Sequence, residues 1–202
     1  YHEIPNINKP LIADASSVIL SEPLDVNKFS LIYAGAQKNI GPAGLTIVII
    51  DRDFMEYGNP NIPNILKYSE HSLSESMLNT PPTFAWYMAG KVFKWIKDSG
   101  GLDYFKTQNH KKASKLYEFI DNSSFYSNNV DSVNRSIMNV PFLLANDDLD
   151  KTFLSEAEDN ELINLKGHRS VGGMRASIYN AMPLEGVEEL IKFMEHFEST
   201  YG

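Results

Sequence analysis

The stretch from Leu31 to Ile50 reads LIYAGAQKNIGPAGLTIVII and decides the fold of the first half of this chain. Two apolar runs, 31–34 and 45–50, flank a loop of small residues that contains Lys38. Both runs are short and rich in β-branched residues, which predicts two buried strands. Partial burial lowers the pKa of a lysine, and the neutral amine is the form that makes a Schiff base with a carbonyl. The small neighbours leave space for a flat ligand, although a lysine in a surface turn that reaches water is the alternative.

A second strand-like segment, 11–17, ends in an acid and two hydroxyls, Asp14, Ser16 and Ser17. Ligands of open α/β sheets bind outside the carboxyl ends of the strands, where we expect Asp14. An enzyme that uses pyridoxal phosphate (PLP) needs a carboxylate against the pyridine nitrogen, so Asp14 followed by Lys38 fits PLP chemistry. The alternative for Asp14 is a helix cap or a turn residue, which is by itself the commoner use of an aspartate. The two serines could bind a phosphate or cap a helix.

Four blocks, in the same order, resemble the phosphoserine aminotransferase family, which are class-V aminotransferases. They are IYAGAQKNIGPAGLT at 32–46, MLNTPPTFAWY at 77–87, RSIMNVPF at 135–142 and KGHRSVGGMRASIYNAMP at 166–183. The likeness runs from about Leu11 to the last residue. It implies an α/β fold, fold-type I of the PLP enzymes. Residues 1–100 would be the C-terminal part of the PLP-binding large domain, a mixed sheet with helices, and 101–202 a small α+β C-terminal domain.

The resemblance also implies how the cofactor, pyridoxal 5'-phosphate, is held. Lys38 would bond it covalently and shuttle protons, and Asp14 would pair with the pyridinium nitrogen. Gln37 would contact the cofactor phosphate. Asn79 and Thr80 would reach the phosphate of the other subunit, since family members are homodimers with shared active sites. From the residues alone, Thr80 could instead be a helix N-cap with Pro81 just inside the helix, and both uses could hold together.

The implied reaction is transamination between glutamate and 3-phosphohydroxypyruvate, giving O-phosphoserine and 2-oxoglutarate in serine biosynthesis. Arg175 would hold the substrate α-carboxylate, and His168 and Arg169 of the partner subunit would bind its phosphate. A planar guanidinium suits both anions because it donates two parallel hydrogen bonds. The alternatives are a solvated basic pair for His168 and Arg169, and a surface strand residue for Arg175.

The chain departs from the family pattern in extent, because it matches only about the C-terminal half of such an enzyme. We therefore expect a fragment that is inactive alone. Two other readings stay open: a non-catalytic dimerising remnant, and another PLP transaminase or lyase of the same fold. A cysteine desulfurase is disfavoured because the chain has no cysteine. A second role in pyridoxine biosynthesis is left open.

The composition argues against nucleic-acid and membrane partners. Among 202 residues the net charge is −8, which argues against nucleic acid as the main partner, since phosphate backbones require basic patches. No apolar run is long enough to span a bilayer, and no signal peptide is evident, so we expect a cytoplasmic protein without a membrane partner. No metal site is predicted.

Periodicity predicts the remaining elements. We expect helices over 81–98, 102–120 and 149–162 and a last helix from Pro183, strands over 136–144 and 174–180, and a turn-rich segment over 51–63. Pro141 suggests that its strand is an edge strand or carries a bulge. The apolar face of the first helix is predicted to hold Phe84, Tyr87, Met88, Val92, Trp95 and Ile96. The lysines of the second helix are expected to form a solvated face: Lys106, Lys111, Lys112 and Lys115.

Overall fold

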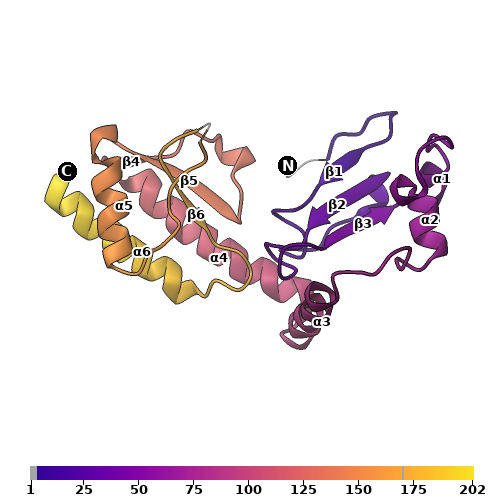
Figure 1. Cartoon of the computed structure of the whole chain (residues 1–202). Helices are drawn as coiled ribbons and strands as arrows, with labels where there is room; N and C mark the ends of the chain where they lie inside the picture. Colours follow the sequence, from indigo (N-terminus) through magenta and orange to yellow (C-terminus); the bar gives the residue numbers. More distant parts are fainter. Residues whose placement is uncertain (1–3, 170) are drawn as a thin grey trace. The chain divides into compact units, whose positions relative to one another are not determined.

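The computed structural model describes residues 4–169 and 171–202. They form two compact units, of which the first reaches Leu102 and the second runs from Asp103 to Gly202. The boundary between the two units lies in the first turn of helix α4 (Gly101–Asn122). It is next to Gly100 and Gly101, whose φ angles are 109° and 74°. Each unit has a sheet of its own (Figure 1).

The first unit contains a mixed three-stranded sheet. Its strands are β1 (Ile12–Asp14), β2 (Leu31–Gly35) and β3 (Thr46–Ile50), in that order across the sheet. β1 runs parallel to β2, and β3 runs antiparallel to it. The two strands predicted on either side of Lys38 are therefore confirmed. The core of this unit is built largely from small and β-branched side chains: Ala15, Ile32, Ala34, Ala36, Ile40 and Ala89.

The described part of the first unit also contains four short helices and one long helix. They are η1 (Val26–Lys28), α1 (Arg52–Met55), η2 (Asn64–Leu66) and α2 (Tyr68–Leu73), and α3 spans Thr83–Asp98. The alternative in which Thr80 caps this helix is wrong, because the N-cap of α3 is Pro82, which offers no side-chain hydrogen bond.

The predicted apolar face of α3 is also partly wrong. The helix buries Ala85, Ala89 and Ile96, whereas Phe84 and Tyr87 are 69% and 60% exposed. A β-carbon placed on Gly41 would lie 3.5 Å from the backbone nitrogen of Ala89. The loop and the helix approach so closely that only small side chains fit between them.

The second unit packs three helices on one face of an antiparallel sheet (Figure 1). The strands are β4 (Tyr126–Ser127), β5 (Asn139–Leu144) and β6 (Met174–Ser177). The helices are α4, α5 (Asp150–Asp159) and α6 (Leu184–Tyr201), with short turns η3 (Ser132–Asn134) and η4 (Asp147–Leu149). Alternate residues of β5 are buried, so one face of the sheet lies in the core. The ring of Phe153 is at the centre of that core, 5.0 Å from the ring of Phe197 and 5.8 Å from that of Phe142.

The prediction of an edge strand or bulge at Pro141 is wrong, because β5 is the central strand and Pro141 is paired directly with Arg175 of β6. The carbonyl of Pro141 accepts from Asn128 Nδ2 (2.5 Å), and Asn128 follows the last residue of β4. A strand residue directs its nitrogen and carbonyl to the same side. The missing N–H of Pro141 therefore points past the end of β4, where no ladder bond is lost.

The expected solvated lysine face is wrong at Lys112, which is 2% exposed. Its Nζ donates to the backbone carbonyls of Ile178 (3.1 Å), Tyr179 (2.9 Å) and Met182 (2.9 Å). One turn earlier on α4, Asn109 Nδ2 donates to Asn180 Oδ1 (2.8 Å). Two buried polar side chains thus fix the connection between β6 and α6. Burial lowers the pKa of Lys112 from 10.5 to about 8.

Candidate functional site

Asp14 is the last residue of β1, at the carboxyl end of the strand. Its Oδ1 accepts hydrogen bonds from the backbone N–H (2.9 Å) and the hydroxyl (2.6 Å) of Ser16. The Ser16 hydroxyl accepts in turn from the N–H of Gly35, the last residue of β2 (3.0 Å). The bonds from Ser16 lower the pKa of the Asp14 carboxyl, which is therefore ionised at neutral pH. Asp14 serves as a turn residue while presenting an anion at the sheet edge.

Lys38 lies in the turn between β2 and β3, at the same edge of the sheet as Asp14. It is half-buried, and its Nζ donates to the hydroxyl of Ser17 (2.7 Å). The turn is closed by hydrogen bonds from Ala36 N–H to the carbonyl of Leu45 (2.9 Å) and from the N–H of Gly41 to the carbonyl of Ala36 (2.8 Å). The charge of Lys38 also lowers the pKa of Asp14. The structure thus brings the two predicted residues together.

We expected the small residues around Lys38 to leave room for a flat ligand, but not all glycines of this turn do so. A β-carbon on Gly35 would lie 2.5 Å from Oε1 of Gln37, so the amide of Gln37 already fills that space. A β-carbon on Gly41 would be in ordinary van der Waals contact with the backbone of α3. Only Gly44, with a φ of 101°, faces open space within 4 Å. Gln37 itself is exposed, beside Lys38.

Tyr33 is a neighbour of Asp14 that sequence reasoning missed. It stands directly opposite Asp14 in the parallel ladder, and its hydroxyl helps to lower the pKa of that carboxyl. The negative charge of Asp14 in turn raises the pKa of the Tyr33 hydroxyl. The available signal was the alternation of β2, because Tyr33 is the exposed residue between two buried ones.

Asn79 and Thr80 belong to the same unit as Asp14 and Lys38. Both are exposed in the segment before α3, and Asn79 Nδ2 donates to the carbonyl of Thr80 (3.3 Å). Asn79 lines a hollow of about 590 Å³ formed with residues of β3, α2 and α3. Their contact with a cofactor phosphate of a partner subunit stays a prediction.

Arg175 lies on β6 in the second unit, on the sheet face opposite the helices. Its backbone N–H donates to the carbonyl of Leu165 (2.7 Å), which fixes the loop 160–167 beside the strand. Its Nε is buried and has no hydrogen-bond partner among the described residues. A buried guanidinium nitrogen without an acceptor is costly, so this position is suited to a ligand that supplies one.

His168 and Arg169 are exposed in the tight loop before β6. The carbonyl of His168 accepts from the N–H groups of Val171 and Gly172, both at 2.9 Å. Gly172 and Gly173 have positive φ angles of 78° and 58°, and Gly173 is packed against Leu143 and the carbonyl of Phe142. These glycines allow the reversal that presents the two basic side chains.

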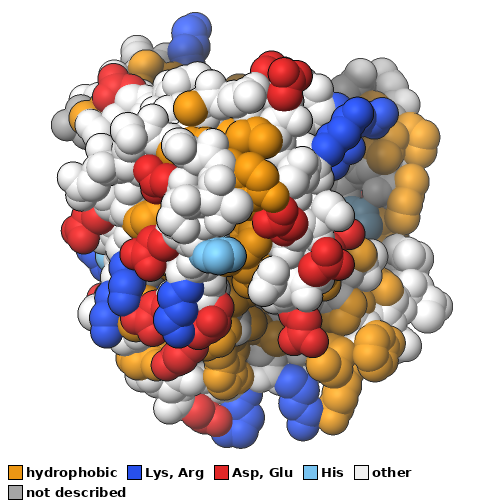
Figure 2. Space-filling model, turned by 90° about the vertical axis from the view of Figure 1, so that its left-hand side faces the viewer, with side chains coloured by type: hydrophobic (Ala, Val, Ile, Leu, Met, Phe, Trp, Pro, Cys, Tyr) orange, Lys and Arg blue, Asp and Glu red, His pale blue; other side chains and the backbone are white. Residues whose placement is uncertain are grey.

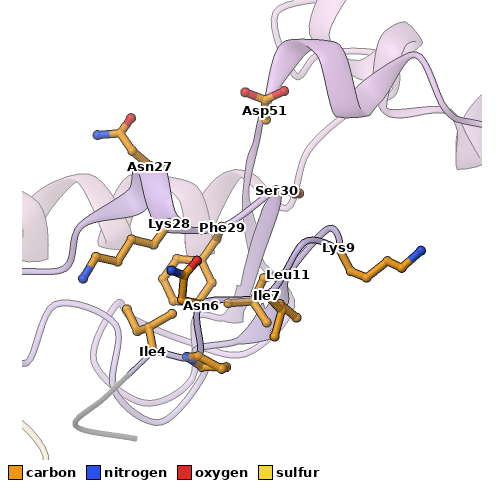
Figure 3. A pocket seen from close by; sticks show the side chains of 11 residues that line it. Ile4, Asn6, Ile7, Lys9, Leu11, Asn27, Lys28, Phe29, Ser30 and Asp51 are labelled. Carbon is orange, nitrogen blue, oxygen red and sulfur yellow. The ribbon is translucent and has the colours of Figure 1, made fainter.

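A cavity of about 450 Å³ in the first unit contains none of the predicted site residues (Figure 3). Ile4, Ile7, Leu11 and Phe29 supply its apolar wall. Leu11 and Ser30 immediately precede β1 and β2, so the cavity lies at the amino ends of those strands. Parallel sheets bind ligands at the opposite end, where Asp14 and Lys38 are. We therefore assign the candidate site to the carboxyl edge.

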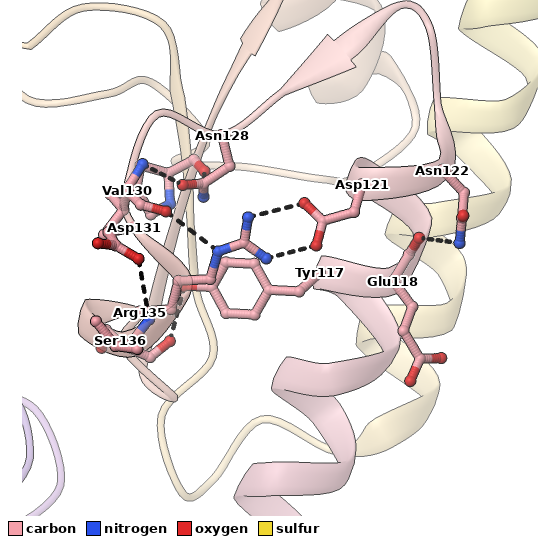
Figure 4. A network of polar contacts seen from close by, with 11 residues as sticks. Tyr117, Glu118, Asp121, Asn122, Asn128, Val130, Asp131, Arg135 and Ser136 are labelled. Carbon is pink, nitrogen blue, oxygen red and sulfur yellow. Dashed lines mark hydrogen bonds and ion pairs between the residues drawn. The ribbon is translucent and has the colours of Figure 1, made fainter. Parts of the chain in front are cut away.

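Arg135 begins one of the four sequence blocks, yet its guanidinium is used within the fold (Figure 4). It donates to both carboxylate oxygens of Asp121 (2.6 and 2.8 Å) and to the carbonyl of Val130 (3.3 Å). It also stacks over Tyr117, 4.7 Å from the ring centroid. This arrangement raises the pKa of Arg135 and lowers that of Asp121. Arg135 therefore joins α4 to the segment before β5.

The remaining features of the described part of the chain concern surface charge, metal binding and membrane spans. One face of the molecule shows acidic, basic and apolar side chains interspersed (Figure 2). Within residues 4–169 and 171–202, no cluster of three or more His, Cys, Asp or Glu side chains could hold a metal ion. No helix of that part of the chain is both long and apolar enough to cross a membrane.

Comparison with known proteins gives consistent matches. The family model described as "Aminotransferase class-V" matches residues 3–190. A phosphoserine aminotransferase from Acinetobacter baylyi is 58% identical over 202 residues, which are 100% of this chain and 56% of that protein. The solved phosphoserine aminotransferase from Bacillus circulans subsp. alkalophilus is 48% identical with a TM-score of 0.96, and covers 100% of this chain and 56% of its own.

A PLP-bound phosphoserine aminotransferase from Trichomonas vaginalis is 41% identical with a TM-score of 0.92, over 96% of this chain and 56% of that one. The chain therefore spans about half the length of the relatives it matches. These structures also confirm the predicted mixed α/β fold of the PLP-dependent transferases.

Proposed function

Because this chain belongs to the class-V aminotransferase family, we propose that the whole protein is a PLP-dependent phosphoserine aminotransferase. It would transfer an amino group from glutamate to 3-phosphohydroxypyruvate, giving 2-oxoglutarate and O-phosphoserine. The activity is proposed for the whole protein, since this chain spans 56% of the Acinetobacter baylyi relative. The observation that carries the proposal is the pairing of a half-buried Lys38 with an ionised Asp14 at one edge of the sheet.

The residues at this edge fit pyridoxal phosphate. Bound PLP would supply an electron sink for the negative charge that develops at the substrate α-carbon. Asp14, kept ionised by Ser16, would hold a proton on the ring nitrogen. The amine of Lys38 would hold the cofactor covalently and later move a proton at the α-carbon. Ser17, which contacts the Nζ of Lys38 at 2.7 Å, would orient that amine.

Further residues would bind the anionic groups. Gln37 would donate to the cofactor phosphate from its exposed position beside Lys38. Asn79 and Thr80 would reach the cofactor phosphate of a partner subunit, which requires a homodimer with shared sites. Both are exposed and therefore accessible to a second chain.

The substrate would be held by its two anionic ends. Arg175 would bind the α-carboxylate common to glutamate and phosphoserine, because its Nε is buried without an acceptor among the described residues. His168 and Arg169 would bind the substrate phosphate from the exposed loop before β6. Separate cationic groups for the two ends explain how one site accepts two acids that share only the α-amino-acid part.

Trapping the cofactor on its lysine tests the proposal. The whole protein is incubated with PLP, reduced with borohydride, digested and mapped by mass spectrometry. We expect the label on Lys38, and we expect Lys38→Ala to lose both the label and nearly all turnover of glutamate with 3-phosphohydroxypyruvate. The matched control is Lys97→Ala, which changes an exposed lysine of the same unit. Label on other lysines, or normal turnover of the Lys38 variant, contradicts the proposed mechanism.

A further inference from the structure

The face of the second sheet that carries Arg175 also carries an amide with an unusual arrangement of hydrogen bonds. Asn139 is directly opposite Ser177 in the β5–β6 ladder, and Arg175 is opposite Pro141. Residues two positions apart on a strand share a face, so Asn139 and Arg175 are diagonal neighbours on the face away from the helices. Such diagonal positions are separated by roughly 7–8 Å, which long side chains can bridge.

The oxygen of the Asn139 amide is fully occupied. Asn139 Oδ1 accepts from the hydroxyl of Ser177 (3.2 Å) and from the hydroxyl of Tyr179 (3.1 Å). An amide oxygen has two lone pairs, so these bonds satisfy it and fix the orientation of the side chain. The Nδ2 group, with two N–H donors, has no partner among the described residues.

The position of Tyr179 is itself fixed from the other side of the sheet. Its carbonyl accepts from Lys112 Nζ (2.9 Å), and the adjacent carbonyl of Ile178 accepts from the same ammonium (3.1 Å). The N–H of Ile178 donates to the carbonyl of Met138, next to Asn139 (2.9 Å). The backbone of residues 178–179 is therefore held by Lys112 of α4 and by Met138 before β5. This backbone positions the Tyr179 hydroxyl that donates to the Asn139 amide.

We propose that Asn139 is a second substrate-binding residue, whose Nδ2 donates to the same α-carboxylate as Arg175. The buried Nε of Arg175 and the solvent-accessible Nδ2 of Asn139 share one face of two paired strands, and neither has an acceptor among the described residues. A group that only accepts hydrogen bonds and carries negative charge satisfies both, and a carboxylate has this chemistry. This inference rests on the proposed function for the identity of the substrate. The arrangement of donors follows from the fold alone.

The test compares two ligands that differ only in the α-carboxylate, O-phosphoserine and O-phosphoethanolamine. Their binding is measured by calorimetry on the whole protein loaded with pyridoxamine phosphate, which has no aldehyde to react with either amine. In Asn139→Asp the donor becomes an acceptor with a negative charge, at nearly unchanged size. We expect at least about tenfold weaker binding of O-phosphoserine, because a hydrogen bond to a charged group is lost and repulsion is added. We expect O-phosphoethanolamine to bind as it does to the wild type.

Two further variants control for folding and for charge. Asn139→Ala removes the donor without adding charge, and we expect the same selective loss, at about half the size on a logarithmic scale. Asn146→Asp adds one negative charge elsewhere in the same unit and can keep its capping bond to the N–H of Asp148 (3.0 Å). We expect Asn146→Asp to bind both ligands as the wild type does.

Each other outcome overturns the proposal. Equal weakening of both ligands would give Asn139 a purely structural role, and no change in either would mean that its amide does not meet the carboxylate. A wild type that binds the two ligands equally would mean that this face holds no carboxylate site. The proposed function can fail independently of this proposal. If the wild type binds O-phosphoserine more tightly through Asn139 but transfers no amino group, the carboxylate site is supported and the proposed reaction is contradicted.

Discussion

Replacement of Lys112 by methionine should destabilise the second unit, and the structure allows the size of the loss to be estimated. Methionine keeps the apolar shaft of the side chain but donates no hydrogen bonds. Three carbonyls, those of Ile178, Tyr179 and Met182, lose the ammonium. The carbonyl of Tyr179 keeps a bond from the N–H of Met182 (2.9 Å), so the main cost falls on the other two.

Each buried carbonyl left without a donor costs about 1–3 kcal/mol, which gives about 2–6 kcal/mol for two. The variant gains in return, because it no longer buries an ammonium. That burial lowers the pKa of Lys112 from 10.5 to about 8, so the gain at neutral pH is about 3 kcal/mol. At the centre of its range the carbonyl cost is about 4 kcal/mol, which exceeds this gain. We expect a net loss of about 1 kcal/mol in the free energy of unfolding at neutral pH.

The pH dependence has a definite sign. Between pH 8 and 10.5 the unfolded chain binds the proton of Lys112 more tightly than the folded chain does. The stability of the wild type therefore gains a contribution that rises with pH in this window, by up to about 1.4 kcal/mol per pH unit. The methionine variant lacks this contribution. The difference in stability between the two proteins should therefore widen from about pH 7 to about pH 9.5.

The assay is urea-induced unfolding of the whole protein, followed by far-UV circular dichroism, with hydrogen exchange of peptides that cover 174–187 to localise the change. Lys111→Met is the matched control, since Lys111 is the exposed neighbour on the same helix, and we expect it to stay within about 0.5 kcal/mol of wild type. A Lys112 variant as stable as the wild type would refute the role of these bonds. A stability difference that narrows with rising pH would refute the lowered pKa.

Two further predictions concern other residues. Asp121→Asn should cost no more than about 1 kcal/mol, because the carboxylate that pairs with Arg135 is 47% exposed. Because Arg135 lowers the pKa of Asp121, the wild type loses the stability that this pair contributes as the pH falls through that pKa. The free energies of unfolding of the two proteins, measured with urea, should therefore differ at neutral pH and converge at acidic pH. A stability difference that does not change with pH would contradict the pairing. Arg169→Ala should lower kcat/KM for phosphorylated substrates much more than for glutamate. The extra loss should correspond to about 2–5 kcal/mol of transition-state free energy, and equal losses for both substrates would overturn its assignment to the phosphate.

The parts of the site that could be read from the sequence are those that depend on neighbours along the chain. The strands beside Lys38 were predicted because their apolar runs are short and bounded by a glycine-rich loop. Asp14 was expected at the carboxyl end of a strand, where open α/β sheets bind ligands, and Lys38 was expected in the loop between two strands. The roles of Ser16 and Ser17 stayed open, since a hydroxyl next to a strand end can bond a carboxylate, an amine or a helix equally well.

The parts that could not be read depend on contacts between distant segments. Lys112 belongs to a run of lysines on a helix, a pattern typical of a solvated surface. Its acceptors are backbone carbonyls 66–70 residues further along the chain, and carbonyls carry no signal in a sequence. The exposed aromatic residues of α3 were misread for a related reason. Apolar periodicity marks a helix but does not show that Gly41 leaves room only for alanines beneath it.

Two cationic side chains of the second unit, Lys112 and Arg175, show how structural and ligand-binding charges can be distinguished. Both have polar groups inside the protein, where a charge without a partner is costly. The fold gives Lys112 three carbonyl acceptors and so satisfies it completely. It leaves the Nε of Arg175 without an acceptor among the described residues. A stable protein can retain such an unsatisfied donor if a ligand satisfies it during function, which is why Arg175, rather than the more deeply buried Lys112, is the candidate for binding substrate.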